Sequence, residues 1–230
     1  MGLLPHRLIP AGRAVKANLI PGLVLQAFAL TIVLLYFNTE SARAGLNRIG
    51  ALKAEWGYVF SALSTACFGG LIPYLVLLGT GRIPRERRLS EAFFYIFFWL
   101  YKGMEVDALY RLQAILFGAE ASATVILIKV VVDQFVYNTF WSAPSQTAAF
   151  VWKDAGFSLS GARAMFARSS LVNRSLVVLM STWVVWIPAV AIIYSLPGAL
   201  QLPLFNLVLC FWCLLLSFVS REAADDASAN

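Results

Sequence analysis

The sequence predicts an all-α protein: a polytopic transmembrane helical bundle with about six membrane-spanning helices, one of them an extra N-terminal helix. Hydrophobic residues make up 60% of the 230 residues and only 13% are charged, whereas a soluble domain carries about a quarter charged residues. Long apolar runs recur along the chain, and several approach the roughly 20 residues that a transmembrane helix needs. The basic residues cluster between these runs, a distribution typical of membrane proteins and not of nucleic-acid-binding proteins.

The first predicted span covers residues 18–37 and follows a basic leader, residues 1–17. A secretory signal peptide has a similar pattern, and Ala-Arg-Ala at 42–44 resembles a cleavage site. The apolar run of about 20 residues exceeds the 7–15 usual for a signal core, which favours a retained helix. The predicted units are the leader with its helix and connection (1–54), a transmembrane bundle (55–220) and a disordered acidic tail (221–230).

Five further spans follow, separated by polar or turn-forming residues. The second contains Gly69, Gly70 and Pro73; small residues allow close helix approach, and a proline frees a carbonyl that a neighbouring group must satisfy. The fifth contains Pro188, which is expected to kink it. An amphipathic segment over 145–173 is expected to lie on the membrane surface. These five spans are residues 56–78, 92–117, 121–141, 176–196 and 202–219.

The Lys and Arg residues divide unevenly between the two sides of such a bundle. Six spans place both termini on one side, and that side receives twelve of the 18 Lys and Arg residues. Because positively charged loops stay in the cytoplasm, both termini are predicted to be cytoplasmic. The opposite side receives Arg43, Arg48 and Lys53, all within the polar connection of residues 38–55. A bacterial cytoplasmic membrane is the first expectation, because the leader lacks a long Ser- and Arg-rich presequence; a mitochondrial or peroxisomal membrane is the alternative.

The fourth span, residues 121–141, carries charges near its middle. Lys129 and Asp133 are four residues apart, so they are expected on one helical face, where they can pair. Gln134 and Asn138 extend the polar face. Charges within a bilayer are costly and normally face protein or water. This stripe has two interpretations: a neutralised ion pair that holds helices together, or the lining of a small-solute path.

The third span has a lipid-like first half, AFFYIFFWLY, and a charged second half. Lys102 and Glu105 are three residues apart, and Asp107 and Arg111 are four apart, so both pairs can form along the helix. Either this end emerges among headgroups and its charges are solvated, or the charges face the same interior as the fourth span. The candidate pore or polar-network residues are Glu105, Asp107, Arg111, Lys129, Asp133 and Gln134.

No cofactor or metal site is predicted, and we do not expect an enzyme. His6 stands alone in the leader, and the three cysteines lie in apolar runs, so no zinc or haem ligand set is expected. Cys210 and Cys213 lack the soluble context of a redox motif, and we interpret them as packing residues. The acidic residues of the third span have no orienting partner by spacing alone, as general acid–base catalysis would need.

Several short motifs follow one another over roughly residues 55–220. They include a lysine before Asp-Gln with a proline downstream, paired tryptophans before a proline, and an aromatic residue before a hydrophobic-Pro pair. The residues of these motifs are Gly103, Tyr110, Lys129, Asp133, Gln134, Pro144, Trp183, Trp186, Pro188, Tyr194, Leu196, Pro197, Trp212 and Ser217. In their order the chain resembles the Mpv-seventeen family of small peroxisomal and inner-mitochondrial membrane proteins.

The chain also departs from the family pattern. Met104 replaces a proline, Asp107 a histidine and Leu109 a tryptophan. Ile187 separates the second tryptophan from its proline, and Gln201 stands where an arginine is common. The first predicted helix has no clear counterpart. These departures suggest a distant branch of bacterial type.

The resemblance implies a small-solute pore or a protein that influences membrane permeability and homeostasis. Both signs of charge are present, which argues against an ion-selective ring of one sign. The alternative is a structural or adaptor membrane protein, whose basic loop Arg82–Arg88 and segment 145–173 bind anionic lipid or a partner. A homo-oligomer fits either function. A pore predicts a continuous wet path between the helices, and an adaptor predicts a dry, closed bundle.

Overall fold

The computed structural model is a bundle of long helices, with no strand among the residues that it describes. Backbone is described for residues 4–168 and 171–228, and side chains for residues 19–167, 171–172, 175–176, 179–180 and 182–214. The elements are α1 (Leu4–Asn38), α2 (Glu40–Trp56), α3 (Tyr58–Thr65), η1 (Ala66–Leu71), α4 (Ile72–Gly79), η2 (Arg85–Arg87), α5 (Arg88–Phe117), α6 (Ala123–Val131), η3 (Val132–Ser142), α7 (Ala143–Asp154), α8 (Leu159–Arg168), α9 (Leu171–Tyr194) and α10 (Gly198–Ser228).

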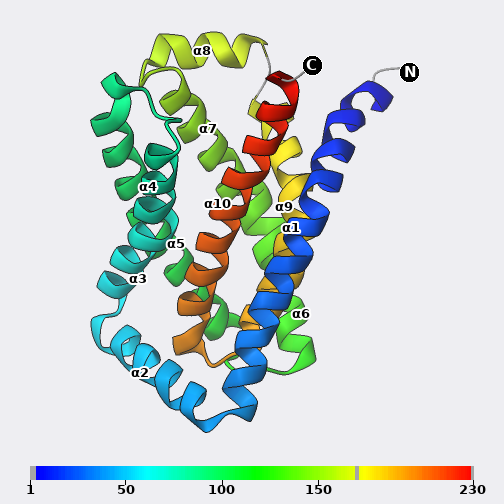
Figure 1. The fold of residues 1–230 in the computed structure, drawn as a ribbon. Helices are drawn as coiled ribbons and strands as arrows, with labels where there is room; N and C mark the ends of the chain where they lie inside the picture. Colours follow the sequence, from blue (N-terminus) through cyan, green and yellow to red (C-terminus); the bar gives the residue numbers. More distant parts are fainter. Residues whose placement is uncertain (1–3, 169–170, 229–230) are drawn as a thin grey trace.

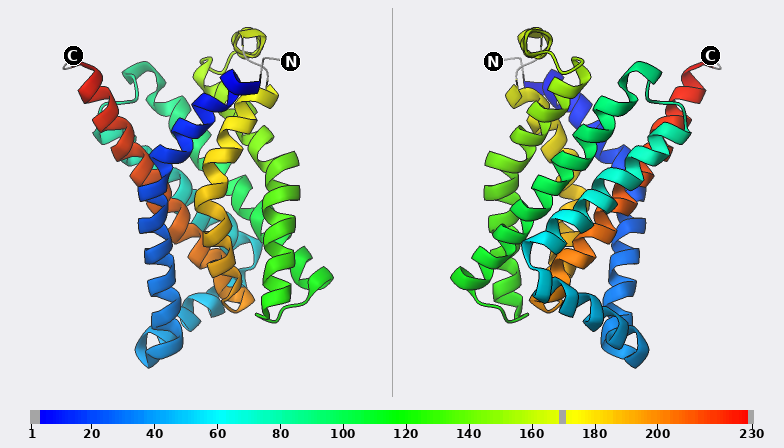
Figure 2. Two further views of the ribbon diagram at one scale, coloured as in Figure 1. Left: turned by 90° about the vertical axis from the view of Figure 1, so that its right-hand side faces the viewer. Right: turned by 90° about the vertical axis from the view of Figure 1, so that its left-hand side faces the viewer.

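The chain runs back and forth between the two ends of the bundle (Figure 1). The start of α1 and the end of α10 lie at one end, together with α8, whereas α2 lies across the other end. α10 crosses the bundle obliquely between its neighbours (Figure 2). It continues to Ser228, into the predicted acidic tail. Because the described residues form helices and no strand, the predicted all-α class is confirmed.

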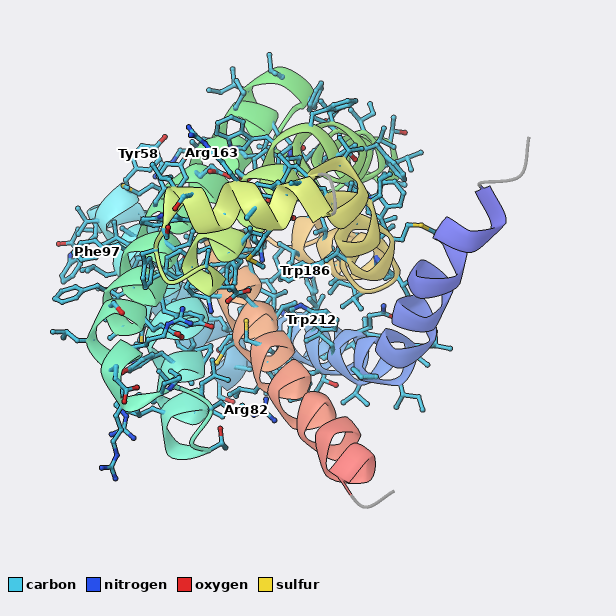
Figure 3. The ribbon with its side chains drawn as sticks, turned by 90° about the horizontal axis from the view of Figure 1, so that it is seen from above. Tyr58, Arg82, Phe97, Arg163, Trp186 and Trp212 are labelled. Carbon is cyan, nitrogen blue, oxygen red and sulfur yellow. The ribbon has the colours of Figure 1, made fainter. Side chains whose placement is uncertain are left out.

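Among the described residues, three helical runs are long and apolar enough to cross a membrane: Leu19–Asn38, Tyr58–Gly79 and Ala123–Asp154. Two shorter apolar helices, Thr182–Tyr194 and Gly198–Leu214, accompany them. Large apolar side chains also cover the outside of the bundle; Phe97, on α5, points away from the other helices (Figure 3). Extensive apolar exposure of this kind is typical of a surface that contacts lipid or another protein.

The two π-helices, η1 and η3, both stand just before a proline. Proline has no N–H, and its ring clashes with the carbonyl four residues earlier. A wider turn, in which each N–H bonds five residues back, relieves that clash. The residues before Pro73 and Pro144 show this bonding: the Ile72 N–H donates to Cys67 O, and the Ala143 N–H donates to Asn138 O. The chain therefore passes both prolines without ending its helix.

This arrangement corrects the predicted end of the fourth span. We expected the span to end at residue 141 and a surface segment to begin at 145. Instead α6, η3 and α7 form one helical run to Asp154, with Pro144 in the first turn of α7, where a missing N–H is tolerated. Only α8, Leu159–Arg168, remains as a separate helix at the end of the bundle where the termini lie.

The predicted polar connection of residues 38–55 is also corrected, because it forms the helix α2. Leu46, Gly50 and Lys53 recur at the spacing of one helical face, and this face packs on the bundle. A side chain at Gly50 would contact Leu200 of α10 at 3.2 Å, so the two helices approach closely there. Lys53 is buried by this packing, although we expected it in an exposed connection.

The N-terminal helix belongs to the core of the bundle and packs along α9. Leu25 and Ala29 of α1 are fully buried, and a Cβ at Gly22 would lie 2.9 Å from Val185. The Gln26 amide donates to Val184 O at 3.2 Å. That carbonyl lies four residues before Pro188, whose missing N–H leaves it without its usual helical donor. A side chain of α1 thus replaces the hydrogen bond that α9 loses.

Candidate functional site

A cavity of about 280 Å³ lies inside the bundle, between η1, α4, α5, η3, α7, α9 and α10. Its wall is mostly apolar, with aromatic side chains from several helices, and a polar part is contributed mainly by η3. Seen from the end where the termini lie, Trp186 and Trp212 lie within the ring of helices (Figure 3). The aromatic lining residues are Tyr95, Trp99, Tyr110, Tyr137, Phe150, Trp186, Phe205 and Trp212, and the polar ones include Lys102, Asp133, Gln134, Asn138, Ser142 and Gln146.

Asp133 is the centre of the polar wall. Its side chain is buried, with 6% of the residue exposed, yet it borders the cavity. One carboxylate oxygen accepts from the Tyr194 hydroxyl at 2.7 Å and the other from the Gln134 amide at 2.8 Å. The Gln113 amide donates to the same Tyr194 hydroxyl at 3.0 Å. We call these four residues the Asp133 cluster; it joins α5, η3 and α9.

The predicted ion pair between Lys129 and Asp133 is not formed. The Lys129 ammonium instead lies 5.7 Å from the centre of the Tyr194 ring. Both residues reach the same side chain of α9, because the hydroxyl of Tyr194 donates to Asp133 at 2.7 Å. Tyr194 therefore separates them, with its ring near the lysine and its hydroxyl on the carboxylate. Lys129 does not neutralise Asp133 as expected.

The predicted pair of Lys102 and Glu105 is confirmed, with 2.8 Å between the ammonium and a carboxylate oxygen. The Tyr137 hydroxyl from η3 donates to the same carboxylate oxygen. The Lys102 ammonium also donates to the Ser145 hydroxyl of α7 at 3.3 Å. Lys102, Glu105 and Tyr137 form what we call the Glu105 cluster, which lies between α5 and η3 inside the bundle.

The predicted pair of Asp107 and Arg111 is confirmed at 3.2 Å, but it is part of a larger group. Lys53 from α2 pairs with the Asp107 carboxylate at 2.8 Å, and the Ser61 hydroxyl donates to it at 2.7 Å. The Arg111 side chain is 46% exposed and lies over the Tyr58 ring, 4.7 Å from its centre. In this Asp107 cluster the carboxylate faces the interior, whereas the guanidinium faces outward.

A second cavity, of about 240 Å³, lies toward the α2 end of the bundle. Tyr110 lines both cavities. Its ring packs edge-on against Tyr194, with 5.2 Å between the centres, and against Phe205 at 6.4 Å. An aromatic layer thus separates the two cavities. Among the described residues, Tyr110 is the side chain that the linings of the two cavities share. The lining of the second cavity includes Lys53, Asp107, Arg111, Lys129 and Gln201.

Several residues singled out by the resemblance lie at close helix contacts or in the cavity wall. Gly103 lets α5 approach α3, because a Cβ there would lie 2.6 Å from the Thr65 hydroxyl. The Trp183 indole donates to Gln134 O at 3.2 Å, beside the Asp133 cluster. Trp186 packs against Phe205, with 5.4 Å between the ring centres.

The remaining motif residues have simpler positions. Pro197 stands in the turn between α9 and α10, where the Leu200 N–H donates to its carbonyl at 2.8 Å. Trp212 lines the first cavity. Pro144 and Pro188 lie in helical runs that continue past them. The side chain of Ser217 lies outside the described part of the structure.

Sequence reasoning missed several polar residues that the fold brings inside. Lys53, Ser61 and Gln113 are all buried and bonded within the clusters. Asn206 of α10 is also buried; it accepts from the Thr65 hydroxyl at 2.7 Å and donates to Ser64 at 2.8 Å. A polar residue in the apolar run LFNLVL was a usable signal, because such residues in membrane helices normally face protein. A second usable signal was the spacing of Lys53 from Leu46 and Gly50, which places the three residues on one helical face.

Comparison with protein-family models, curated proteins and solved structures found no significant match. What the site does must therefore be argued from its own geometry. Among the described residues, no group of three or more His, Cys, Asp or Glu side chains could hold a metal ion. The site combines a cavity, an aromatic wall and a buried carboxylate, an arrangement typical of small-molecule binding.

Proposed function

We propose that this protein is an integral membrane protein that provides a path for small solutes, as a distant relative of the Mpv-seventeen family. The observation that carries the proposal is the cavity of about 280 Å³ with Asp133, Gln134 and Lys102 in its wall. Burying charged groups in a membrane protein is costly unless they are paired or serve a path. A second cavity toward the opposite end extends the path, with Tyr110 between the two.

The topology that we propose has six spans, formed by α1, α3–α4, α5, α6–α7, α9 and α10. Both termini then lie in the cytoplasm, and the membrane is a bacterial cytoplasmic membrane. Cysteines introduced at Gly45 in α2 and at Glu86 in η2, with the native cysteines replaced, should react with an impermeant thiol reagent from opposite sides. Labelling of both from one side would refute the topology.

The direct test measures solute flux into liposomes that contain the purified protein. The wild type should pass small solutes, and Asp133→Asn should change the rate several-fold, because it removes a charge from the cavity wall. Glu120→Gln removes a charge from an exposed connection outside both cavity linings and should leave flux unchanged. Absence of flux from folded wild-type protein would refute the path.

A structural or adaptor function is the second candidate, and a specific observation favours it. The carboxylates of Glu105 and Asp107 are paired with lysines, and the aromatic layer interrupts the path. Paired charges of this kind hold helices together in membranes. On this alternative, reconstituted protein shows no flux but binds vesicles or a partner through Arg82–Arg88, and anionic lipid should strengthen the binding.

A further inference from the structure

Asp133 differs from the other buried or half-buried carboxylates among the described residues. Each of the others has a lysine or arginine partner, whereas Asp133 accepts hydrogen bonds from a tyrosine hydroxyl and a glutamine amide. Both of its donors are neutral. The paired carboxylates are Asp107 with Lys53 at 2.8 Å, Glu105 with Lys102 at 2.8 Å and Glu91 with Arg87 at 3.2 Å.

The nearby cations do not supply the missing charge. Lys102 also lines the cavity, but its ammonium is held by Glu105. Lys129 lies against the face of Tyr194, away from the hydroxyl that reaches Asp133. The charged groups in and behind the cavity wall therefore leave one carboxylate without a counter-ion. A buried carboxylate is costly in that state, so a cation in the cavity would be bound favourably.

The rest of the cavity wall favours an organic cation over a bare metal ion. Calcium takes 6–8 oxygen ligands, whereas Asp133 is the one carboxylate among the described residues of the lining. The aromatic rings of Tyr110, Trp186 and Phe205 in the lining can attract an ammonium group and can also pack against a hydrocarbon body. A volume of about 280 Å³ accommodates a small molecule and not a peptide.

We infer that the first cavity binds a small organic ammonium ion, with its charged nitrogen at the Asp133 carboxylate and its apolar body against the aromatic wall. Binding at this site stands on the geometry alone. That such a cation is also the solute carried across the membrane rests on the proposed function.

The test compares three probes of nearly equal size, using equilibrium dialysis with the full-length protein in lipid nanodiscs and empty nanodiscs as the blank. The probes are 2-phenylethylammonium, neutral 2-phenylethanol and anionic phenylacetate. The cation should bind about tenfold more tightly than either of the other probes. Its ammonium group can donate a hydrogen bond to the Asp133 carboxylate, and a hydrogen bond between charged groups raises the affinity by about this factor. Equal binding of the three, or preference for the anion, would overturn the inference. This comparison uses wild-type protein and so does not depend on the folding of a variant.

Two variants test whether the preference for the cation depends on Asp133. Asp133→Asn keeps the shape but removes the charge, and it should abolish the preference for the cation. Glu120→Gln, outside the cavity, should retain the preference. If folded Asp133→Asn keeps the same preference, the charge of Asp133 is not the determinant and the inference fails.

Flux measurements separate this inference from the proposed function. Flux of neutral and cationic probes at equal rates, with no preference in binding, would support the path and overturn the cation site. Selective binding without flux would support the site and refute the path.

Discussion

At the scale of single residues, Lys53 and Asp107 show how a buried charge depends on its partner. Lys53 and Asp107 are each about 5% exposed or less, so both charges have lost most of their water. Their attraction and the Ser61 hydrogen bond offset that loss only while both partners are present. Arg111 is half-exposed and cannot replace the lysine on the buried side.

Lys53→Met should therefore destabilise the protein by about 3–5 kcal/mol, because it leaves the Asp107 carboxylate buried with too little compensation. Combining it with Asp107→Asn should recover most of the loss, since the amide oxygen can still accept from Ser61. The measurement is the free energy of unfolding in detergent micelles. Arg48→Met, on the exposed side of the same helix, is the control and should have little effect. A double variant as unstable as Lys53→Met would contradict this explanation.

At the scale of helices, the prolines and glycines decide how the elements fit together. Pro73 and Pro144 each follow a π-helix, which keeps the helical run unbroken. At Pro188 the hydrogen bond that the proline cannot donate is replaced from another helix, because the Gln26 amide of α1 donates to the carbonyl of Val184. An interhelical hydrogen bond thus makes the continuity of α9 depend on α1.

Gln26→Leu should cost about 1–3 kcal/mol of unfolding free energy, because it leaves the Val184 carbonyl unsatisfied. In a Pro188→Ala background the same substitution should cost less, since the alanine introduced there would supply the N–H that bonds to Val184 O within the helix. A double-mutant cycle measures this coupling. Equal costs in the two backgrounds would show that Gln26 does not compensate for the proline.

Gly103 should not tolerate a side chain, whereas Gly45 should. A Cβ at Gly103 would lie 2.6 Å from the Thr65 hydroxyl and would press on the Ser61 carbonyl. Gly103→Ala should therefore destabilise the protein by about 1–3 kcal/mol. Gly45 is in α2 with nothing within 4 Å, so Gly45→Ala should stabilise it by about 0.5–1 kcal/mol. Melting temperatures of the two variants, relative to the wild type, decide this prediction; similar shifts would refute it.

At the scale of the whole molecule, the two cavities lie toward opposite ends of one bundle and are separated by Tyr110, Tyr194 and Phe205. A path therefore needs this aromatic layer to move. Tyr194 is fixed by the Asp133 cluster, whereas no hydrogen bond of the Tyr110 hydroxyl is found within the described structure. Tyr110 is thus held by packing, as Phe205 is, and of these two it is Tyr110 that lines both cavities.

Tyr110→Ala should increase flux through liposome-reconstituted protein several-fold, because it removes the ring that lines both cavities. The control is Phe97→Ala, which removes an outward-facing ring from the same helix and should leave flux unchanged. Unchanged flux in a folded Tyr110→Ala variant would place the barrier elsewhere. The effect of this variant also differs from that of Asp133→Asn, which alters the charge of the wall and not its width.

From the amino-acid sequence alone we could predict the all-α class, the apolar runs, and the pairs Lys102–Glu105 and Asp107–Arg111. These features are local: apolar content sets helix burial, and spacings of three and four residues set contacts within one α-helix. The same rule failed for Lys129 and Asp133, because Tyr194 of α9 lies between them, with its ring near the lysine and its hydroxyl on the carboxylate. The local rule also could not foresee that a π-helix would allow the fourth run to continue past Pro144.

The partners that a charged group finds on other helices depend on how the helices pack. Lys53 reaches Asp107 across 54 residues of sequence, and Tyr194 reaches Asp133 across 61. Contacts over such separations depend on how whole helices pack, and helix packing has no short-range signature in the sequence. The cavity, its aromatic wall and the carboxylate without a cation partner arise from that packing, because each is built from residues of several helices.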